Sequence, residues 1–192
     1  CAWGGGQFRT GRGVLRVRAG HGFADAVGEP LARSASPAPR LRGGIAGSAT
    51  AGVADLVAAG ATVVAEVPGT DQGWSASSVV LEAPAAAVAR GSRLLEECFA
   101  PVSIVVEYHS HEELRDLLGR LQGCLVGAVM TGGVDDDEAP ALVARLASMA
   151  GRVAVDTWPT GVALGWAQHH SGPWPATTSP AHTSVGAAAL TR

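Results

Sequence analysis

The fold is decided by residues 102–156, which read VSIVVEYHSHEELRDLLGRLQGCLVGAVMTGGVDDDEAPALVARLASMAGRVAVD. Three nearly continuous apolar runs within this stretch are typical of strands that are buried on both faces. Two segments with apolar residues at helical spacing separate them. In chain order, the strand-like and helix-like segments are residues 102–110, 111–122, 125–133, 135–149 and 151–156. This alternation predicts an α/β fold with a mostly parallel sheet flanked by helices.

The sequence before this stretch contains shorter strand and helix signals. VLRVR alternates as an edge strand does, and later apolar spacing indicates two helices and two further strands. These segments are residues 14–18 (strand), 21–35 (helix), 45–60 (helix), 61–69 (strand), 77–83 (strand) and 85–97 (helical or turn-rich). After residue 156 the sequence is rich in Gly, Pro, Ser, Thr and Trp and loses its periodicity. Such a segment is typical of chain that wraps a site or an interface.

The composition is that of an ordinary globular chain. Its 192 residues suffice for one packed core, and 47% of them are hydrophobic, 16% are charged, and the net charge is −3. All 14 basic residues are arginines, and their scattered positions argue against a nucleic-acid partner. The sequence has no run of about 18 apolar residues and no signal-peptide pattern. We therefore expect no membrane partner and a cytoplasmic location.

Several common catalytic motifs are absent. A chain without lysine cannot have a Walker A phosphate loop, and GxGxxG, GxSxG and HExxH do not occur. Cys1, Cys98 and Cys124 are widely spaced and odd in number, which favours reduced thiols over a disulfide framework or a CxxC metal site.

Three small clusters leave alternatives open. His109 and His111 could share a metal or be exposed polar residues, and we expect no metal there. The acidic run at residues 135–138 could bind a hard cation or cap the following helix. His169 and His170 could line a pocket in the irregular region.

Four segments together resemble the aldehyde dehydrogenase superfamily. They occur in family order, span nearly the whole chain, and read GQFRTGRGVL, LLEECFAPVSIVVEY, GRVAVDTWPTGV and HHSGPWPATTSPAHTSVG. Within the superfamily the resemblance is to the branch that includes ketoglutaric semialdehyde dehydrogenase. It implies NAD- or NADP-dependent oxidation of an aldehyde, with 2,5-dioxopentanoate as the expected substrate, to a carboxylic acid through a cysteine thiolate.

The glycine-rich run GGGQFRTGRG, residues 4–13, holds an arginine where the family has its nucleophile. The resemblance places Arg9 at the position of the catalytic cysteine, between Phe8 and Thr10. A guanidinium is protonated at any working pH and has no lone pair with which to attack a carbonyl. We therefore expect this chain to be catalytically inactive. Cys98 could supply a thiol, although a simpler interpretation is a small apolar filler.

On the cofactor side, the resemblance implies that Glu97 holds the nicotinamide ribose and that Phe99 packs near the nicotinamide ring. NAD or NADP is the expected cofactor. Taken alone, Glu97 would be interpreted as a solvated charge at a helix end. Ala100 stands where the family has a glycine, which adds a methyl group to this turn.

The resemblance implies that most of the substrate-binding residues lie in the last two of these four segments, GRVAVDTWPTGV and HHSGPWPATTSPAHTSVG. Asp156 stands where the family has an asparagine, so an anion replaces an amide donor. Ser171 replaces a family glycine, and Trp158 and Trp174 could equally be packing anchors. The substrate-binding residues that the resemblance implies are Phe8, Thr10, Asp156, Trp158, Thr160, Gly161, Val162 and His170.

The resemblance implies one partial aldehyde dehydrogenase catalytic domain over residues 1–192. The family's cofactor-binding domain, its general base and its final oligomerisation strand are expected to be absent from this chain. The expected partners are a small-molecule aldehyde and a second copy or partner subunit. The alternatives are a non-catalytic relic that binds a partner subunit or a small molecule, and a decayed reading frame whose product does not fold alone.

Overall fold

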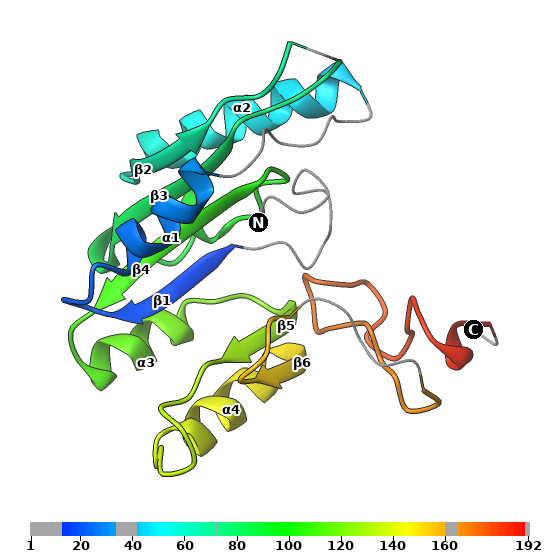
Figure 1. Ribbon diagram of the computed structural model, residues 1–192. Coiled ribbons are helices and arrows are strands. Elements are labelled where there is room, and N and C mark those ends of the chain that lie inside the picture. Colours follow the sequence, from blue (N-terminus) through cyan, green and yellow to red (C-terminus); the bar gives the residue numbers. More distant parts are fainter. Residues whose placement is uncertain (1–12, 34–41, 72, 160–164, 191–192) are drawn as a thin grey trace. The chain divides into compact units, whose positions relative to one another are not determined.

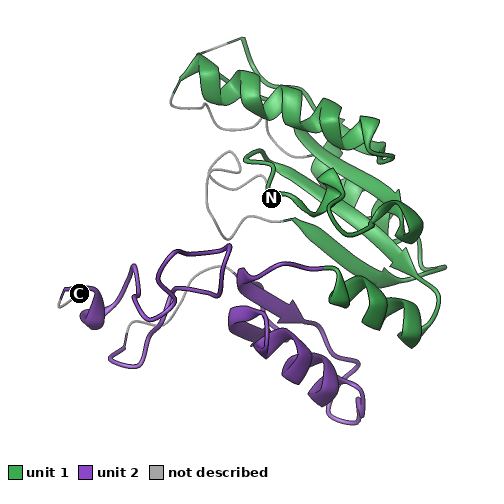
Figure 2. Ribbon diagram, turned by 180° about the vertical axis from the view of Figure 1, so that it is seen from behind, with its two compact units in different colours: residues 1–120 green, residues 121–192 purple. Residues whose placement is uncertain are grey.

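The chain forms two compact units, residues 1–120 (unit 1) and residues 121–192 (unit 2), which Figure 2 colours separately. The computed structural model describes residues 13–33, 42–71, 73–159 and 165–190.

Unit 1 is built on a four-stranded sheet in the order β1-β4-β3-β2 (Figure 1). β4 pairs in parallel with both β1 and β3, whereas β2 is antiparallel to β3. Only residues 68–77 connect β2 to β3, and such a connection is too short for a parallel crossover. The strands are β1 Val14–Arg18, β2 Thr62–Val67, β3 Ser78–Pro84 and β4 Val102–Tyr108.

Helices cover both faces of this sheet. α1 packs against Val80 and Val105 on one face, while α2 and α3 join the core around Leu81 and Ile104 on the other. Successive side chains of a strand point to opposite faces, so a strand covered on both sides is apolar throughout. This explains the nearly continuous apolar run of β4, in which the polar residue Ser103 is also buried. The helices of unit 1 are α1 Phe23–Ala32, α2 Gly43–Ala58, α3 His111–Gly119 and the 3-10 helices η2 Ala85–Ala87 and η3 Arg93–Leu95.

Among its described residues, unit 2 has a two-stranded parallel sheet and one α-helix (Figure 1). Its elements are β5 Cys124–Val129, α4 Ala139–Ala147, β6 Ala150–Val155 and the 3-10 helix η4 Ala187–Leu190. Between β6 and η4, the described residues form turns and irregular structure, as the loss of periodicity after residue 156 predicted.

The predicted order of strands and helices is confirmed, and the fold is α/β with mainly parallel strand pairing. The segment at residues 85–97, expected to be helical or turn-rich, contains η2 and η3. None of the helices in the described part of the chain combines the length and the apolarity that crossing a bilayer requires.

Candidate functional site

The residues expected to form the site divide between the two units. Glu97 and Phe99, expected on the cofactor side, belong to unit 1. Asp156, Trp158 and His170, expected on the substrate side, belong to unit 2. The other site predictions lie outside the described residues, and they are Phe8, Arg9, Thr10, Thr160, Gly161 and Val162. The described site residues therefore fall into two sets, one in each unit.

The turn between η3 and β4 exposes Glu97 and Phe99 on either side of a half-buried Cys98. Cys98 packs against α2, where a Cβ atom built on Gly52 would lie 2.7 Å from the Cys98 Sγ. The Arg93 guanidinium supports the turn by donating a hydrogen bond to the carbonyl oxygen of Glu97 at 3.4 Å. The Glu97 carboxylate and Phe99, which is 45% exposed, are thus accessible to a ligand. The packing of the sulfur supports the interpretation of Cys98 as an apolar filler.

Asp156 joins the ends of β5 and β6. Its backbone is left-handed, with φ of 49°, and its N–H donates to the carbonyl oxygen of Val129 at 2.9 Å. Its carboxylate accepts hydrogen bonds from the backbone N–H and from the hydroxyl of Thr131, both at 2.7 Å. The backbone donor first, and then the hydroxyl, stabilise the anion and lower the pKa of the Asp156 carboxyl. Asp and Asn both tolerate the left-handed conformation, so either residue fits this turn.

Replacing Asp156 with asparagine should make the stability of unit 2 less sensitive to acid. The pKa of Asp156 is lowered from 3.8 in the folded chain. Its ionised form therefore stabilises the fold above its ordinary pKa, and this contribution is lost as the pH falls through the folded value. Asp156→Asn keeps an oxygen for the Thr131 N–H but does not titrate. We expect the difference between the urea midpoints of the two proteins to stay constant above the ordinary pKa of 3.8 and to shrink as the pH falls below it.

The control for this comparison is Asp135→Asn, because Asp135 lies with Thr131 in the connection between β5 and α4 but accepts neither Thr131 bond. The Asp135 variant should follow the wild-type pH dependence. An Asp156→Asn protein that loses stability in acid as steeply as the wild type would contradict the prediction.

The chain folds back toward β6 after Asp156. Arg152, which lies within β6, donates a hydrogen bond from Nη2 to the carbonyl oxygen of Pro159 at 3.0 Å. Trp158 precedes this contact and is 64% exposed. Sequence reasoning missed Arg152, although it stands in the GRVAVDTWPTGV segment, because an arginine in a strand gives no indication of its partner.

Two glycines let the chain at Ser171 lie directly on the first residues of β5 and β6. A Cβ atom built on Gly151 would overlap the carbonyl group of Ser171, with the carbonyl carbon only 2.6 Å away. One built on Gly172 would lie 2.5 Å from the carbonyl oxygen of Cys124. Backbone atoms cannot yield in the way that the end of a flexible side chain can, so only glycine fits at either position. Two of the segments that carry the family resemblance therefore meet within unit 2.

His170 is fixed by the hydroxyl groups of the TSVG segment. Its N–H donates to Thr183 Oγ1 at 2.9 Å, and its carbonyl oxygen accepts from Ser184 Oγ at 3.2 Å. Thr183 is 8% exposed, and its hydroxyl donates to the carbonyl oxygen of Val185 at 3.0 Å. Both backbone polar groups of His170 thus have partners more than ten residues later in the chain.

Replacing Thr183 with valine should destabilise unit 2 by about 1–3 kcal/mol, because the variant leaves the His170 N–H without its buried acceptor. Valine has nearly the shape of threonine, so the loss reports on the hydroxyl. Thr183→Ser keeps the hydroxyl and should retain most of the stability, and Thr178→Val, at an exposed position, is the control. The measurement is the free energy of unfolding, together with hydrogen exchange at the His170 amide. Equal exchange in the Thr183→Val and wild-type proteins would contradict the prediction.

The histidine pair at residues 109 and 111 flanks the start of α3. Ser110 Oγ accepts a hydrogen bond from the N–H of Glu113 at 3.1 Å, and Glu113 Oε2 accepts one from the N–H of His109 at 2.7 Å. This reciprocal arrangement is a variant of the capping box. The side chains around the histidine pair therefore start a helix.

The acidic run at residues 135–138 caps α4, which is one of the two alternatives for this run. Asp136 Oδ1 accepts hydrogen bonds from the backbone N–H groups of Glu138 and Ala139 at 3.1 and 3.2 Å. These bonds satisfy donors that a helix N-terminus otherwise leaves open. In the described part of the chain, no group of three or more His, Cys, Asp and Glu side chains is arranged to hold a metal ion.

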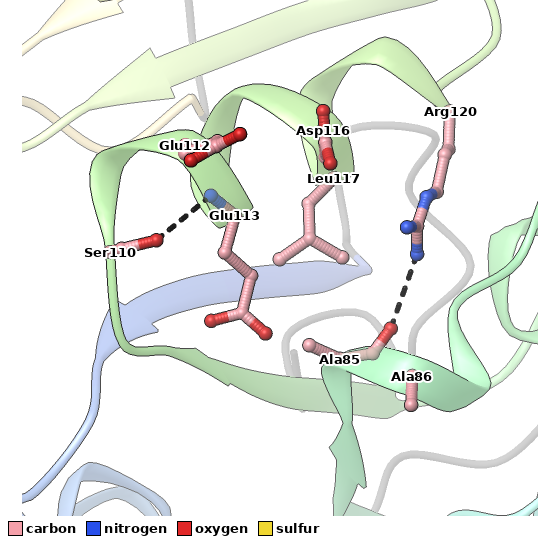
Figure 3. A pocket seen from close by; sticks show the side chains of 8 residues that line it. All are labelled: Ala85, Ala86, Ser110, Glu112, Glu113, Asp116, Leu117 and Arg120. Carbon is pink, nitrogen blue, oxygen red and sulfur yellow. Dashed lines mark hydrogen bonds between the residues drawn. The ribbon is translucent and has the colours of Figure 1, made fainter.

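A hollow of about 380 Å³ lies in unit 1 between η2 and α3 (Figure 3). Arg120 bounds one side and donates a hydrogen bond to the carbonyl oxygen of Ala85 at 3.3 Å. The carboxylates of Glu112, Glu113 and Asp116 line the hollow as well. A second hollow of similar size lies between α1 and β2. Neither contains a residue that the sequence predicted for the site.

Comparison with known proteins supports the family resemblance. No family model matches the sequence. The chain is 34% identical over 152 residues to alpha-ketoglutaric semialdehyde dehydrogenase 2 of Azospirillum brasilense, which covers 74% of this chain and 29% of that protein. It is 37% identical over 100 residues to alpha-ketoglutaric semialdehyde dehydrogenase of Acinetobacter baylyi, which covers 52% of this chain and 19% of that protein. The matches thus span less than a third of either relative.

The fold is also that of solved aldehyde dehydrogenases. The structure of an aldehyde dehydrogenase from Bacillus cereus matches with a TM-score of 0.71 at 17% identity, over 98% of this chain and 38% of that chain. At this identity the match shows the fold alone, and the sequence matches add the relationship. The chain is therefore related in sequence to alpha-ketoglutaric semialdehyde dehydrogenases and has the fold of part of an aldehyde dehydrogenase.

Proposed function

We propose that this chain carries part of an NAD(P)-dependent aldehyde dehydrogenase site, binds an aldehyde, and does not oxidise it. The expected aldehyde is 2,5-dioxopentanoate, the compound for which the two curated relatives are named. The expected location is the cytoplasm. The proposal has three parts, namely aldehyde binding, cofactor binding and the loss of turnover, because different residues are responsible for each.

The aldehyde-binding part is supported by the construction of unit 2. The turn at Trp158 and Pro159 is held by Arg152, and the backbone of His170 is held by Thr183. Binding residues must be held in place by supporting contacts if they are to select a ligand. Each of these contacts lies within one of the two segments of unit 2 that carry the family resemblance, and the close approach of Gly151 to Ser171 joins the two segments. This is the observation that carries the proposal.

The cofactor-binding part is supported by the exposed side chains of Glu97 and Phe99 in unit 1. A carboxylate can accept hydrogen bonds from the two hydroxyls of a ribose, and an aromatic ring can pack on a nicotinamide. NAD or NADP would supply the hydride acceptor of the family reaction. We propose these two residues as the contacts of this chain with that cofactor.

The loss of turnover is proposed from the chemistry of residue 9. In the family reaction, a thiolate attacks the aldehyde carbonyl and forms a carbon–sulfur bond. The Arg9 guanidinium keeps its proton and offers no electron pair, so that bond cannot form. The oxidation step then has no thiohemiacetal from which to proceed.

The test mixes the full chain with NAD or NADP and 2,5-dioxopentanoate. We expect calorimetry to detect binding of the aldehyde, and we expect absorbance to detect no reduced nicotinamide. Turnover would overturn the proposed role of Arg9. A chain that is folded but does not bind the aldehyde would overturn the binding function.

A second candidate function is binding of a partner subunit, which is favoured by exposed indoles in unit 2. Trp158, Trp166 and Trp174 are 64%, 87% and 73% exposed. Large exposed aromatic side chains are enriched at protein interfaces. Titration of the chain with an intact homologous aldehyde dehydrogenase subunit would detect such an association, and the absence of heat would count against it.

A further inference from the structure

We propose that Arg152 is a positioning residue for the aldehyde-side turn at residues 156–159. The inference rests on the proposed function, because it assumes that Trp158 lies beside the aldehyde. Arg152 acts through the carbonyl oxygen of Pro159 rather than through a contact with the substrate. The turn in question is short, exposed and without helix or strand of its own.

The separation of Arg152 and Pro159 along the chain shows how strongly their hydrogen bond constrains the path of the backbone between them. Pro159 follows Arg152 by seven residues, and seven residues of continued strand would extend about 23 Å. The side chain of an arginine is far shorter than that. Because Nη2 lies 3.0 Å from the Pro159 oxygen, the chain after β6 reverses. Asp156, in the left-handed conformation, supplies the reversal.

Arg152 is suited to this task because it starts from a rigid element. It pairs with Val126 in the parallel register of β5 and β6. Its stem is half-buried, and its planar guanidinium offers donors in a fixed geometry. A hydrogen bond from a charged donor is also stronger than one between neutral groups. A position held from a strand is better defined than one held from a loop.

Trp158 lies between two anchors. On one side, the Asp156 carboxylate is bound by Thr131, and on the other, the Pro159 carbonyl is bound by Arg152. Only residues 157 and 158 separate these anchors, so the backbone that carries the indole has little freedom. The indole itself is 64% exposed and can meet a ligand. We infer that Arg152 sets the placement of the Trp158 indole.

The test uses the full chain labelled with fluorotryptophan, with the Trp158 resonance assigned by Trp158→Phe. Arg152→Met removes the donors and keeps most of the stem. Arg145→Met is the matched control, because Arg145 is an exposed arginine on α4 of the same unit. Arg152→Lys keeps a charged donor on a flexible stem, and Arg152→Gln is too short to reach Pro159.

We expect Arg152→Met to shift the Trp158 resonance, to leave that of Trp74 in unit 1 unchanged, and to raise the dissociation constant of 2,5-dioxopentanoate about tenfold. Arg152→Lys should show both changes to a smaller extent, because it keeps a charged donor. Arg145→Met should show neither change. An unchanged Trp158 resonance in folded Arg152→Met would overturn the inference, and Arg152→Gln decides in the same way if the Met variant does not fold. Failure of the wild type to bind the aldehyde would contradict only the proposed function, since the resonance still reports on Arg152.

Discussion

Replacing Gly151 with alanine should detach the segment around Ser171 from the sheet of unit 2 and destabilise this unit by about 3 kcal/mol, at the upper end of the usual cost of overpacking. The new methyl group would meet the Ser171 carbonyl carbon at 2.6 Å and the Cα atom of Gly172 at 2.9 Å. Both are backbone atoms of a segment that is itself buried, since Ser171 is 2% exposed. The clash cannot be relieved by rotating a side chain, so the segment must move.

This loss of folding stability is large for unit 2 because the unit has a small core. The described regular structure of unit 2 comprises two strands, one α-helix and one 3-10 helix, so its core is small. Small cores provide little stability beyond the cost of ordering the chain. A loss of several kcal/mol would leave the irregular segment without a fixed position. The hydroxyl contacts from Ser171 to Thr177 and to the Ser179 carbonyl would be lost with it.

The matched control is Gly165→Ala in the same unit, because a Cβ atom there would meet nothing within 4 Å. Each variant is unfolded with urea and followed by the near-ultraviolet signal of the tryptophans and by hydrogen exchange in β5 and β6. Hydrogen exchange at individual amides distinguishes the unfolding of unit 1 from that of unit 2, since the two unfolding transitions need not coincide. A Gly151→Ala protein that unfolds at the midpoint of the Gly165→Ala protein would contradict the prediction.

The elements of the fold could be predicted because each has a periodic pattern that its environment imposes. β4 is apolar at nearly every position of residues 102–106 because helices cover both faces of its sheet. α3 was predicted from the spacing of Leu114, Leu117 and Leu118, and all three are buried. In both cases the local sequence carries the information, since strand and helix periods differ.

The contacts that fix the candidate site could not be predicted in this way. Arg152 bonds to a backbone carbonyl, and the backbone of His170 bonds to the Thr183 hydroxyl, so one partner in each pair has no sequence signature. Gly151 did carry a signal. A glycine inside a strand often marks a close approach of another backbone. The division into two units also lacked a signal, because the apolar pattern continues on both sides of residue 120.

Replacing Arg9 with cysteine should give this chain the thiol chemistry that the family resemblance implies. The introduced thiolate would attack the aldehyde carbon, the carbonyl oxygen would take up a proton, and a thiohemiacetal would form. Sulfur in a thiohemiacetal cannot be alkylated. We therefore expect saturating 2,5-dioxopentanoate to slow alkylation of the introduced thiol by iodoacetamide at least about tenfold, because binding beside the thiol raises the effective concentration of the aldehyde.

The experiment contains its own controls. Tandem mass analysis of peptides separates the introduced thiol from the native thiols of Cys1, Cys98 and Cys124, which should react at the same rate with and without aldehyde. Cys98 and Cys124 are half-buried. Arg9→Ser has nearly the shape of the cysteine variant and should gain no alkylation. Protection of all thiols alike would indicate addition of aldehyde from solution rather than at a site. Absence of protection would contradict the assignment of residue 9 to the nucleophile position. A thiolate beside a bound aldehyde has an electron pair with which to attack the carbonyl, whereas a guanidinium has none.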